Sequence, residues 1–260
     1  MSKIAVILTH YEDSHLDKAV QSILNQTCRD FELHIVDDCS PSFAKYDYDL
    51  KWKNDKRVNI YRSDINVGTY RLKNAILDKL DCEYVVYQDS DDLSSKNRLE
   101  VQSDYLDNAK RIDLLGSAFY TQFADGQMCI SRRPTYPKLI YWLGWRNVIL
   151  HGTCMLRRSI LSVLGGFDGT TRIAADDEFF YRFFLIGNAR NIQKPLYTRR
   201  VVESSLTGSS ATGYLSKKRL DYKCEAENRL AELKKMGKKQ RLREMINKKN
   251  DVEFSLEKIL

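Results

Sequence analysis

The stretch Tyr84-Val85-Val86-Tyr87-Gln88-Asp89-Ser90-Asp91-Asp92 joins a short apolar run directly to a cluster of carboxylates. Its first four residues are apolar or aromatic, which is typical of a strand buried on both faces. The three carboxylates therefore follow the end of the expected strand. Because like charges a few ångströms apart repel one another, such a cluster is unfavourable unless a cation neutralises it or water solvates it.

Three more apolar runs precede this stretch, and helical patterns separate them. We expect strands over 4–8, 31–36 and 58–61, and helices over 15–26 and 70–80. Strands that are apolar on both faces and alternate with helices indicate an α/β fold with a mostly parallel sheet flanked by helices. A chain of 260 residues is long enough to bury one full core.

The second half of the chain is less regular. Two strands, a buried aromatic helix and an extended segment are expected over 113–120, 152–156, 177–185 and 195–202, respectively. The helix carries five aromatic residues within six positions, which favours burial on a core.

The net charge of +7 is concentrated near the C-terminus. From Lys217 to Lys249 there are thirteen Lys or Arg and only five Asp or Glu, in a helix-prone sequence. We therefore divide the chain into a domain of residues 1–213 and a basic helical extension of residues 214–260. Such an extension can contact phospholipid headgroups, a charged polymer or nucleic acid, or it can be only a solvated helix. We expect peripheral contact with a membrane and no nucleic acid.

No apolar stretch reaches the roughly 18 residues that a membrane span requires, and the N-terminus has no signal-peptide cleavage pattern. Six cysteines are scattered singly, without Cys-x-x-Cys pairs or paired histidine spacing. We expect no zinc site, no disulfide framework, buried or half-buried thiols, and a location in the cytoplasm or at the inner face of the membrane.

Polar residues follow three of the expected strands: Thr9-His10-Tyr11, Asp37-Asp38 and the acidic cluster at residues 89–92. In open parallel sheets, ligands bind in the crevice outside the carboxyl ends of the strands. We therefore expect these three polar endings to converge on one rim and to form the ligand site.

Within the acidic cluster, Asp89 and Asp91 alternate along an expected extended loop. One can contact the sugar of a nucleotide while the other holds a hard divalent cation, which prefers oxygen ligands. The cation would neutralise a departing diphosphate. The alternative interpretation is a helix N-terminal cap.

Arg71 and Lys73 stand at the start of the expected helix over 70–80, just after Gly68. A helix N-terminus and two cations together would favour a diphosphate. Alternatively, either residue could be an ordinary charged side chain on the exposed surface of the helix.

If the departing diphosphate leaves in a group transfer, the hydroxyl that accepts the group must lose its proton to a general base, which is normally a carboxylate. Asp176-Asp177-Glu178 is the best candidate for this base. These acids could instead serve only as favourable charges at a helix start. His151 could line an acceptor pocket or be structural. Arg199 and Ser205 belong to a basic, hydroxyl-rich stretch that suits either a lid or an ordinary surface loop.

Several motifs in order resemble family 2 glycosyltransferases with the GT-A fold, over roughly residues 3–208. They are Val6-Ile7-Leu8-Thr9-His10-Tyr11, Gln21-Ser22-Ile23-Leu24-Asn25-Gln26-Thr27, Glu32-Leu33-His34-Ile35-Val36-Asp37-Asp38-Cys39-Ser40, Asn66-Val67-Gly68 with Lys73-Asn74, Gln88-Asp89-Ser90-Asp91-Asp92, Gly165-Gly166-Phe167-Asp168 and Asp176-Asp177-Glu178-Phe179-Phe180-Tyr181-Arg182. Motifs in the correct order are more specific than any one of them.

The resemblance implies a metal-dependent, inverting transferase that uses Mn²⁺ or Mg²⁺. The implied donor is a nucleotide-diphosphate sugar, with a UDP-sugar expected. The implied acceptor is a glycan, a polysaccharide or a lipid-linked glycan, to which a hexosyl or N-acetylhexosaminyl group is added.

The same resemblance implies roles for single residues. Thr9 and Tyr11 would lie by the nucleotide, Asp38 near its base, and Asp89-Ser90-Asp91 would form the nucleotide-sugar and metal motif, with Asp92 supporting it. The family's base is usually the Asp of a Glu-Asp pair six residues before an Arg. Counting back from Arg182 gives Asp176, although Ala175 stands where the Glu is expected, so Asp177 remains the second candidate.

Two other functions fit the same fold class. A sugar nucleotidyltransferase would normally have a Gly-rich, basic loop after the first strand, whereas residues 9–13 are Thr-His-Tyr-Glu-Asp. A non-catalytic nucleotide-sugar-binding protein would keep Asp89 and Asp91 but would need no base.

Overall fold

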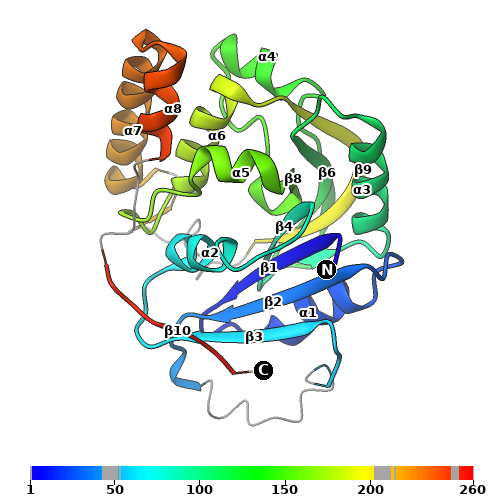
Figure 1. The fold of residues 1–260 in the computed structure, drawn as a ribbon. Helices are drawn as coiled ribbons and strands as arrows, with labels where there is room; N and C mark the ends of the chain where they lie inside the picture. Colours follow the sequence, from blue (N-terminus) through cyan, green and yellow to red (C-terminus); the bar gives the residue numbers. More distant parts are fainter. Residues whose placement is uncertain are drawn as a thin grey trace.

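The structure is a computed structural model that describes residues 2–42, 52, 54–201, 212–213, 215–246 and 252–259. Its elements, shown in Figure 1, are β1 (Ile4–His10), α1 (Leu16–Leu24), β2 (Phe31–Asp37), β3 (Val58–Ser63), α2 (Thr69–Leu77), β4 (Tyr84–Asp89), β5 (Leu93–Ser94), α3 (Arg98–Asn108), β6 (Leu114–Gln122), β7 (Met128–Ser131), α4 (Pro137–Trp142), the 3₁₀ turn η2 (His151–Thr153), β8 (Met155–Arg157), α5 (Arg158–Leu164), α6 (Ala175–Ile186), β9 (Ala189–Arg200), α7 (Lys217–Lys235), α8 (Lys238–Ile246) and β10 (Leu256–Lys258).

Within the described chain, ten strands form one mixed sheet in the order β10-β3-β2-β1-β4-β8-β6-β9-β5, with β7 paired to β6. The strands β3, β2, β1 and β4 are parallel, and β8 joins β4 in the antiparallel direction. The expected α/β fold, with a parallel central sheet flanked by helices, is confirmed.

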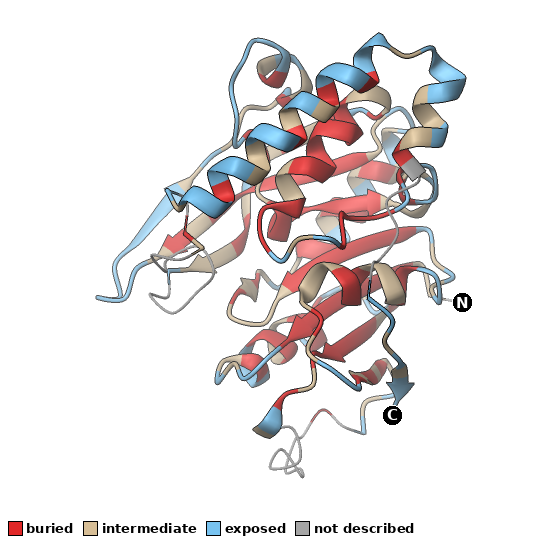
Figure 2. Cartoon of the chain, turned by 90° about the vertical axis from the view of Figure 1, so that its left-hand side faces the viewer, coloured by how far each residue is buried: buried red, intermediate tan, exposed pale blue. Residues whose placement is uncertain are grey.

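The central strands are buried on both faces, as their uninterrupted apolar sequences predict. All seven residues of β1 are buried, and they alternate between two cores. Ile4, Val6 and Leu8 pack with the helices α1 and α3, whereas Ile7 packs with α2, α5 and α6. Figure 2 shows the strands as a buried layer behind the more exposed helices.

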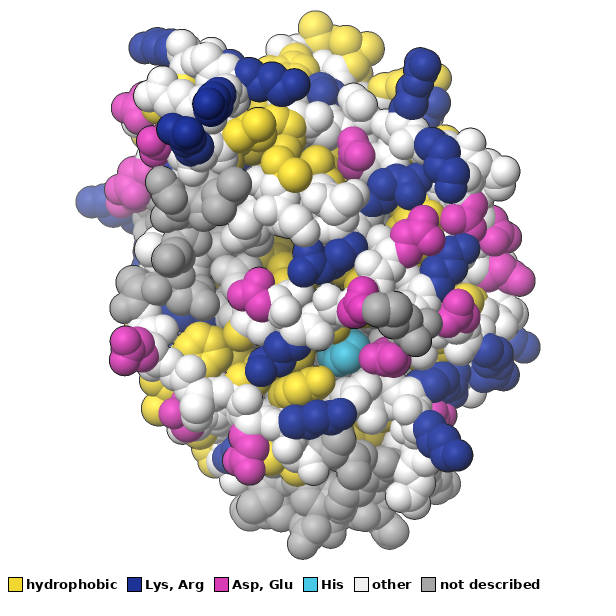
Figure 3. Space-filling view, in the orientation of Figure 1, with side chains coloured by type: hydrophobic (Ala, Val, Ile, Leu, Met, Phe, Trp, Pro, Cys, Tyr) yellow, Lys and Arg dark blue, Asp and Glu magenta, His cyan; other side chains and the backbone are white. Residues whose placement is uncertain are grey.

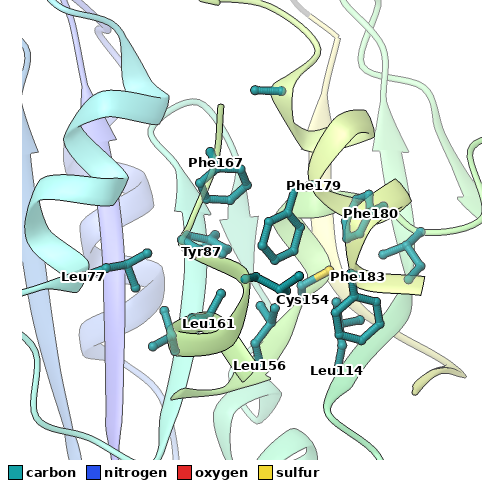
Figure 4. Packing of buried hydrophobic residues seen from close by; sticks show 14 of the residues in the cluster. Leu77, Tyr87, Leu114, Cys154, Leu156, Leu161, Phe167, Phe179, Phe180 and Phe183 are labelled. Atoms are coloured by element: carbon teal, nitrogen blue, oxygen red, sulfur yellow. The ribbon is translucent and has the colours of Figure 1, made fainter. Parts of the chain in front are cut away.

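The aromatic helix α6 forms the centre of the second core. Its aromatic side chains are all buried, and Phe179 and Phe183 point toward β4, β6 and β8 with Cys154 and Leu156 between them (Figure 4). The helix begins at Ala175, two residues earlier than expected. The acids Asp176-Asp177-Glu178 therefore lie in its first turn and not ahead of it.

The C-terminal extension is packed against the rest of the molecule. In place of one continuous helix, α7 and α8 are separated by Met236-Gly237, and they lie beside α6 and α5 (Figure 1). A strand that the sequence analysis did not expect, β10, then pairs antiparallel with β3. The division of the chain at residue 213 stays a prediction.

All six cysteines are free. The expectation that all are buried or half-buried is wrong for Cys129 and Cys224, which are exposed. Cys129 lies on β7, an edge strand with exposed neighbours, and Cys224 on the outer side of α7. None of the helices in the described part of the chain is long and apolar enough to cross a bilayer.

Candidate active site

The carboxyl ends of β1, β2 and β4 lie on one rim of the sheet. In the sheet register, Thr9 of β1 lies between Val36 of β2 and Asp89 of β4. The Thr9 hydroxyl is 2.6 Å from that of Thr69, the first residue of α2. Tyr11 follows β1 with half of its surface exposed. Two of the expected polar endings and the start of α2 therefore meet at this rim.

Asp38, just after β2, fixes the loop that leads into α2. Its buried carboxylate accepts hydrogen bonds from the backbone N–H of Val67 (2.7 Å) and of Gly68 (2.8 Å), and from the Asn66 side chain (3.1 Å). Burial raises the pKa of Asp38, and these backbone N–H groups oppose the rise. Gly68 has a φ of +91°, which favours glycine. Asp38 thus fixes the position of residues 66–68 at this rim of the sheet.

Arg71 is also directed at this loop and not at solvent. Its guanidinium is buried and donates to the carbonyl of Val67 at 2.9 Å. Its charge also lowers the pKa of Asp38, although burial has the larger and opposite effect. Arg71 therefore stabilises the entry to α2.

Residues 89–92, which we call the acidic loop, contain carboxylates in different surroundings. The Asp89 side chain is 41% exposed, Asp91 is half-buried, and Asp92 is buried. Burial, together with the nearby carboxylates of Asp89 and Asp13, raises the pKa of Asp91 to about 6. Ser90 donates a hydrogen bond to Asp13 at 3.0 Å, which brings a fourth carboxylate to the loop.

Asp92 supports the acidic loop from inside the molecule. It is 4% exposed, and its Oδ1 accepts a hydrogen bond from the backbone N–H of Arg200 at 2.7 Å. The buried Tyr197 hydroxyl bonds to Asp92 and also accepts from the Asp89 N–H at 3.4 Å. These contacts follow from the pairing of β5 with β9, which brings the end of β9 beside the loop.

Helix α2 connects the acidic loop with the first turn of α6. Lys73 is only 2% exposed, and its Nζ lies 3.7 Å from Oδ1 of Asp89. Three residues earlier, the Tyr70 hydroxyl donates to Oδ1 of Asp176 at 3.0 Å. Burial lowers the pKa of Lys73, while the nearby carboxylates of Asp89 and Asp176 oppose that change. One buried cation thus interacts with both acidic groups.

Each acid in the first turn of α6 has its own partner. Asp176 accepts the Tyr70 hydrogen bond, and Asp177 forms a 2.6 Å ion pair with Lys223 of α7. Glu178 forms a buried two-bond ion pair with Arg182, at 2.8 Å for both bonds.

Arg182 in turn holds the chain before α6. It donates to the carbonyls of Leu164 (2.6 Å) and Gly166 (2.7 Å). The first turn of α6 is therefore fixed from three sides, by α2, α7 and the 164–166 segment.

The last three candidate residues from the sequence, His151, Arg199 and Ser205, do not lie together. His151 is buried against Tyr87, with ring centroids 4.6 Å apart, and burial holds its pKa well below the ordinary value, so the ring is neutral. Arg199 lies at the end of β9, where its charge lowers the pKa of Asp91. Ser205 lies outside the described residues.

Tyr70, Asp13 and Lys223 contact the site, but sequence reasoning did not select them. Tyr70 and Asp13 stand beside quoted motifs, so their positions alone could have suggested them. Lys223 is one of many cations in a basic segment, and only the packing of α7 on α6 distinguishes it.

The acidic loop fits a divalent cation that is only partly coordinated by protein. Among the described residues, no group of three or more His, Cys, Asp or Glu is arranged to hold a metal ion. The Asp89 carboxylate raises the pKa of Asp91, and a cation bound between the two carboxylates would relieve this repulsion. Mg²⁺ is usually held by one or two carboxylates together with water and phosphate oxygens.

The sequence of the chain is similar to the sequences of glycosyltransferases. The model of "Glycosyl transferase family 2" matches residues 4–165. An uncharacterized glycosyltransferase of Methanocaldococcus jannaschii, MJ1057, is 27% identical over 62% of this chain and 58% of its own length. The O-antigen biosynthesis glycosyltransferase WbnJ of Escherichia coli is 29% identical over 65% of this chain and 67% of its own.

Among solved structures, Staphylococcus aureus TarS residues 1–349 in complex with UDP-GlcNAc matches with a TM-score of 0.64 and 21% identity. The match covers 78% of this chain and 60% of TarS 1–349. The chain thus spans about three fifths of the length of MJ1057 and of this TarS fragment.

Proposed function

The chain belongs to glycosyl transferase family 2, and we propose that it moves a hexosyl or N-acetylhexosaminyl group from a nucleotide-diphosphate sugar to a hydroxyl of a glycan acceptor, with inversion. The observation that carries this proposal is the bridge made by α2. Lys73 reaches Asp89 at the acidic loop, and Tyr70 reaches Asp176 in the first turn of α6. Helix α2 would thereby hold the donor diphosphate through Lys73 and the proposed base through Tyr70, one turn apart on the same helix.

The donor would lie along the rim from Tyr11 to the acidic loop. Thr9, Tyr11 and the loop shaped by Asp38 would surround the nucleoside, and Asp89-Ser90-Asp91 would face the ribose and the diphosphate. The solved complex of TarS with UDP-GlcNAc supports a UDP-sugar as the donor of a protein with this fold. Lys73, buried beside Asp89, would add positive charge on the side of the leaving group.

Asp89 and Asp91 would hold Mn²⁺ or Mg²⁺. When bound there, the cation would neutralise the charge that develops on the departing diphosphate. Asp91 must lose its proton for this role, and its pKa of about 6 leaves it mostly ionised at pH 7.

Asp176 would act as the general base. It would accept the proton of the acceptor hydroxyl while that oxygen bonds to the anomeric carbon and the bond from that carbon to the diphosphate breaks. Tyr70 would orient the Asp176 carboxylate, and Tyr70 stays protonated because burial raises its pKa well above the ordinary value. Asp177 is the weaker candidate, since Lys223 already occupies one of its oxygens at 2.6 Å.

The acceptor would be a growing polysaccharide or a lipid-linked glycan. The name of WbnJ, an O-antigen biosynthesis glycosyltransferase, supports a polysaccharide among the relatives. Membrane contact through the basic residues 214–260 and a cytoplasmic location remain part of the proposal.

The experiment is a screen for donor hydrolysis over a panel of nucleotide-sugars, with Mn²⁺, Mg²⁺ or a chelator, followed by chromatography of the released nucleotide. We expect one nucleotide-sugar to be hydrolysed, only when a divalent cation is present. Asp91→Asn should abolish the cation-dependent hydrolysis, whereas Asp104→Asn, on the exposed side of α3, should behave as wild type. Tight donor binding without any hydrolysis or transfer would instead favour a non-catalytic binding protein.

A further inference from the structure

A cluster of exposed apolar side chains lies on α4 and the turn that follows it. We call this cluster, Tyr136, Leu139, Trp142, Leu143 and Trp145, the α4 patch. Their exposed fractions are 57%, 60%, 40%, 67% and 70%, respectively. Single exposed apolar residues are ordinary, but a contiguous group of large ones marks an interaction surface.

The α4 patch is held on a rigid support. On the opposite side of α4, Tyr141 is 3% exposed, and its ring centroid lies 4.8 Å from that of Phe184 and 5.6 Å from that of Tyr181, both on α6. Gly144, between the two most exposed residues of the patch, has a φ of +97° and no atom near its missing Cβ. The turn therefore projects outward from a helix that is anchored in the core.

The surroundings of the α4 patch are positively charged. Lys138 lies on α4 itself, and the guanidinium of Arg190 lies 4.2 Å from the ring centroid of Tyr136. The Nζ of Lys234, at the end of α7, lies 4.2 Å from the ring centroid of Trp142, which brings the basic end of α7 to the edge of the patch. Arg146 is partly neutralised by Glu227 at 2.8 Å. Figure 3 shows hydrophobic side chains at the top of the molecule with Lys and Arg on either side of them.

We propose that the α4 patch docks the protein on an anionic lipid bilayer, with Trp142, Leu143 and Trp145 entering the headgroup region. Tryptophan is favoured at the boundary between headgroups and acyl chains, and leucine contributes buried apolar area. Lys138, Arg190 and Lys234 would lie at the level of the lipid phosphates.

Charge decides between a bilayer and a second copy of the chain. Two α4 patches facing each other would bring two sets of cations together, whereas an anionic bilayer complements them. The surface lies mainly outside residues 214–260, and the proposal does not depend on the proposed glycosyl transfer.

The test uses the full chain, without donor, and unilamellar vesicles of phosphatidylcholine with or without phosphatidylglycerol. The chain has three tryptophans, and Trp52 is buried. A change in tryptophan emission on adding vesicles therefore reports on Trp142 and Trp145. We expect a blue shift, and co-sedimentation, with the phosphatidylglycerol vesicles.

Variants separate the apolar and the charged contributions. Leu143→Ser with Trp145→Ser should lower vesicle partitioning by about tenfold or more, because two large side chains no longer enter the bilayer. Lys234→Gln with Lys235→Gln should lower it by about tenfold on anionic vesicles and not on neutral ones. Leu215→Ser is the matched control, since Leu215 is 89% exposed but lies outside the patch, and its partitioning should equal wild type.

Circular dichroism melts of each variant would verify that the fold is kept. Unchanged partitioning of the Leu143/Trp145 variant would overturn the proposal. The proposal would also be overturned if the wild type bound neither kind of vesicle and formed a dimer that the Leu143/Trp145 variant converts to a monomer. That result would show that a second copy of the chain covers the α4 patch.

Discussion

The acidic loop at the end of β4 and the acidic first turn of α6 each contain three carboxylates, yet they are satisfied in different ways. In the acidic loop, the carboxylates of Asp89 and Asp13 raise the pKa of Asp91, and the cation of Lys73 lies 3.7 Å from Asp89 only. In the first turn of α6, every acid has its own partner: Tyr70 of α2 for Asp176, Lys223 of α7 for Asp177, and Arg182 of α6 itself for Glu178.

This difference indicates two kinds of chemistry. Carboxylates that repel one another beside a half-exposed mouth are suited to a divalent cation, which removes the repulsion on binding. A carboxylate oriented by one hydroxyl, with its neighbours already paired, is suited to proton transfer by a single group. This contrast supports our proposal that the acidic loop binds the cation and the donor and that Asp176 removes the proton.

The largest expected effect is that of Asp176→Asn. The variant should lower turnover by about two to four orders of magnitude, because the acceptor proton no longer has a base. Asp177→Asn should lower turnover by less than about tenfold if Lys223 holds that carboxylate in a structural role. The measurement is steady-state transfer, with the donor identified by the hydrolysis screen. Equal losses in the two variants would remove the distinction between these neighbouring acids.

Asp91→Asn should stabilise the cation-free protein at pH 7. The pKa of the Asp91 carboxyl is about 6 in the folded protein, above its ordinary value, so the folded state binds the proton more tightly than the unfolded state. Stability from this group is thus present below about pH 4 and lost as pH rises through about 6. Removing the charge should add on the order of 2 kcal/mol to the free energy of unfolding.

Urea unfolding at pH 4.5 and pH 7 would measure this effect. The wild type should lose more stability over that interval than Asp91→Asn. A variant that is less stable than wild type at pH 7 would mean that Asp91 is already satisfied within the protein.

Cation-dependent binding of a UDP-sugar should weaken in acid. Below about pH 6, Asp91 must release a proton to ligate the cation, so apparent affinity should fall by about tenfold per pH unit. Isothermal titration with Mn²⁺ at pH 5, 6 and 7 would give the slope. Affinity that does not change over this range would show that Asp91 is not a ligand.

Lys223→Gln should have the smallest effect. The Lys223–Asp177 ion pair is partly buried, so its loss should cost about 1 kcal/mol of stability and reduce turnover only several-fold. Lys218→Gln, an exposed substitution on the same helix, is the matched control. Thermal unfolding and steady-state rates would detect both effects. A loss of turnover as large as that of Asp176→Asn would indicate that Asp177 is the base.

The acidic loop and the rim could be predicted from sequence because their determinants are local. A run such as Tyr84-Val85-Val86-Tyr87 predicts a buried strand, and its carboxyl end fixes where the following acids lie. The supporting role expected for Asp92 agrees with its bond to the Arg200 backbone. The family resemblance was confirmed by the match over residues 4–165.

The partners of Asp176 and Asp177 could not be predicted in the same way. Tyr70 is separated from Asp176 by 106 positions, and Lys223 reaches Asp177 only because α7 packs on α6. The pairing of β10 with β3 is equally remote in sequence. Such contacts depend on how helices pack, and a pattern of residue types does not determine that packing.

The most direct test of the two-cluster assignment is isothermal titration of UDP, in the presence and absence of Mn²⁺, into wild type, Asp91→Asn and Asp176→Asn. The account predicts Mn²⁺-dependent binding to wild type and to Asp176→Asn with the same affinity. Asp91→Asn should bind about 100-fold more weakly, which corresponds to about 2.7 kcal/mol. Wild-type affinity in Asp91→Asn, or lost affinity in Asp176→Asn, would contradict it.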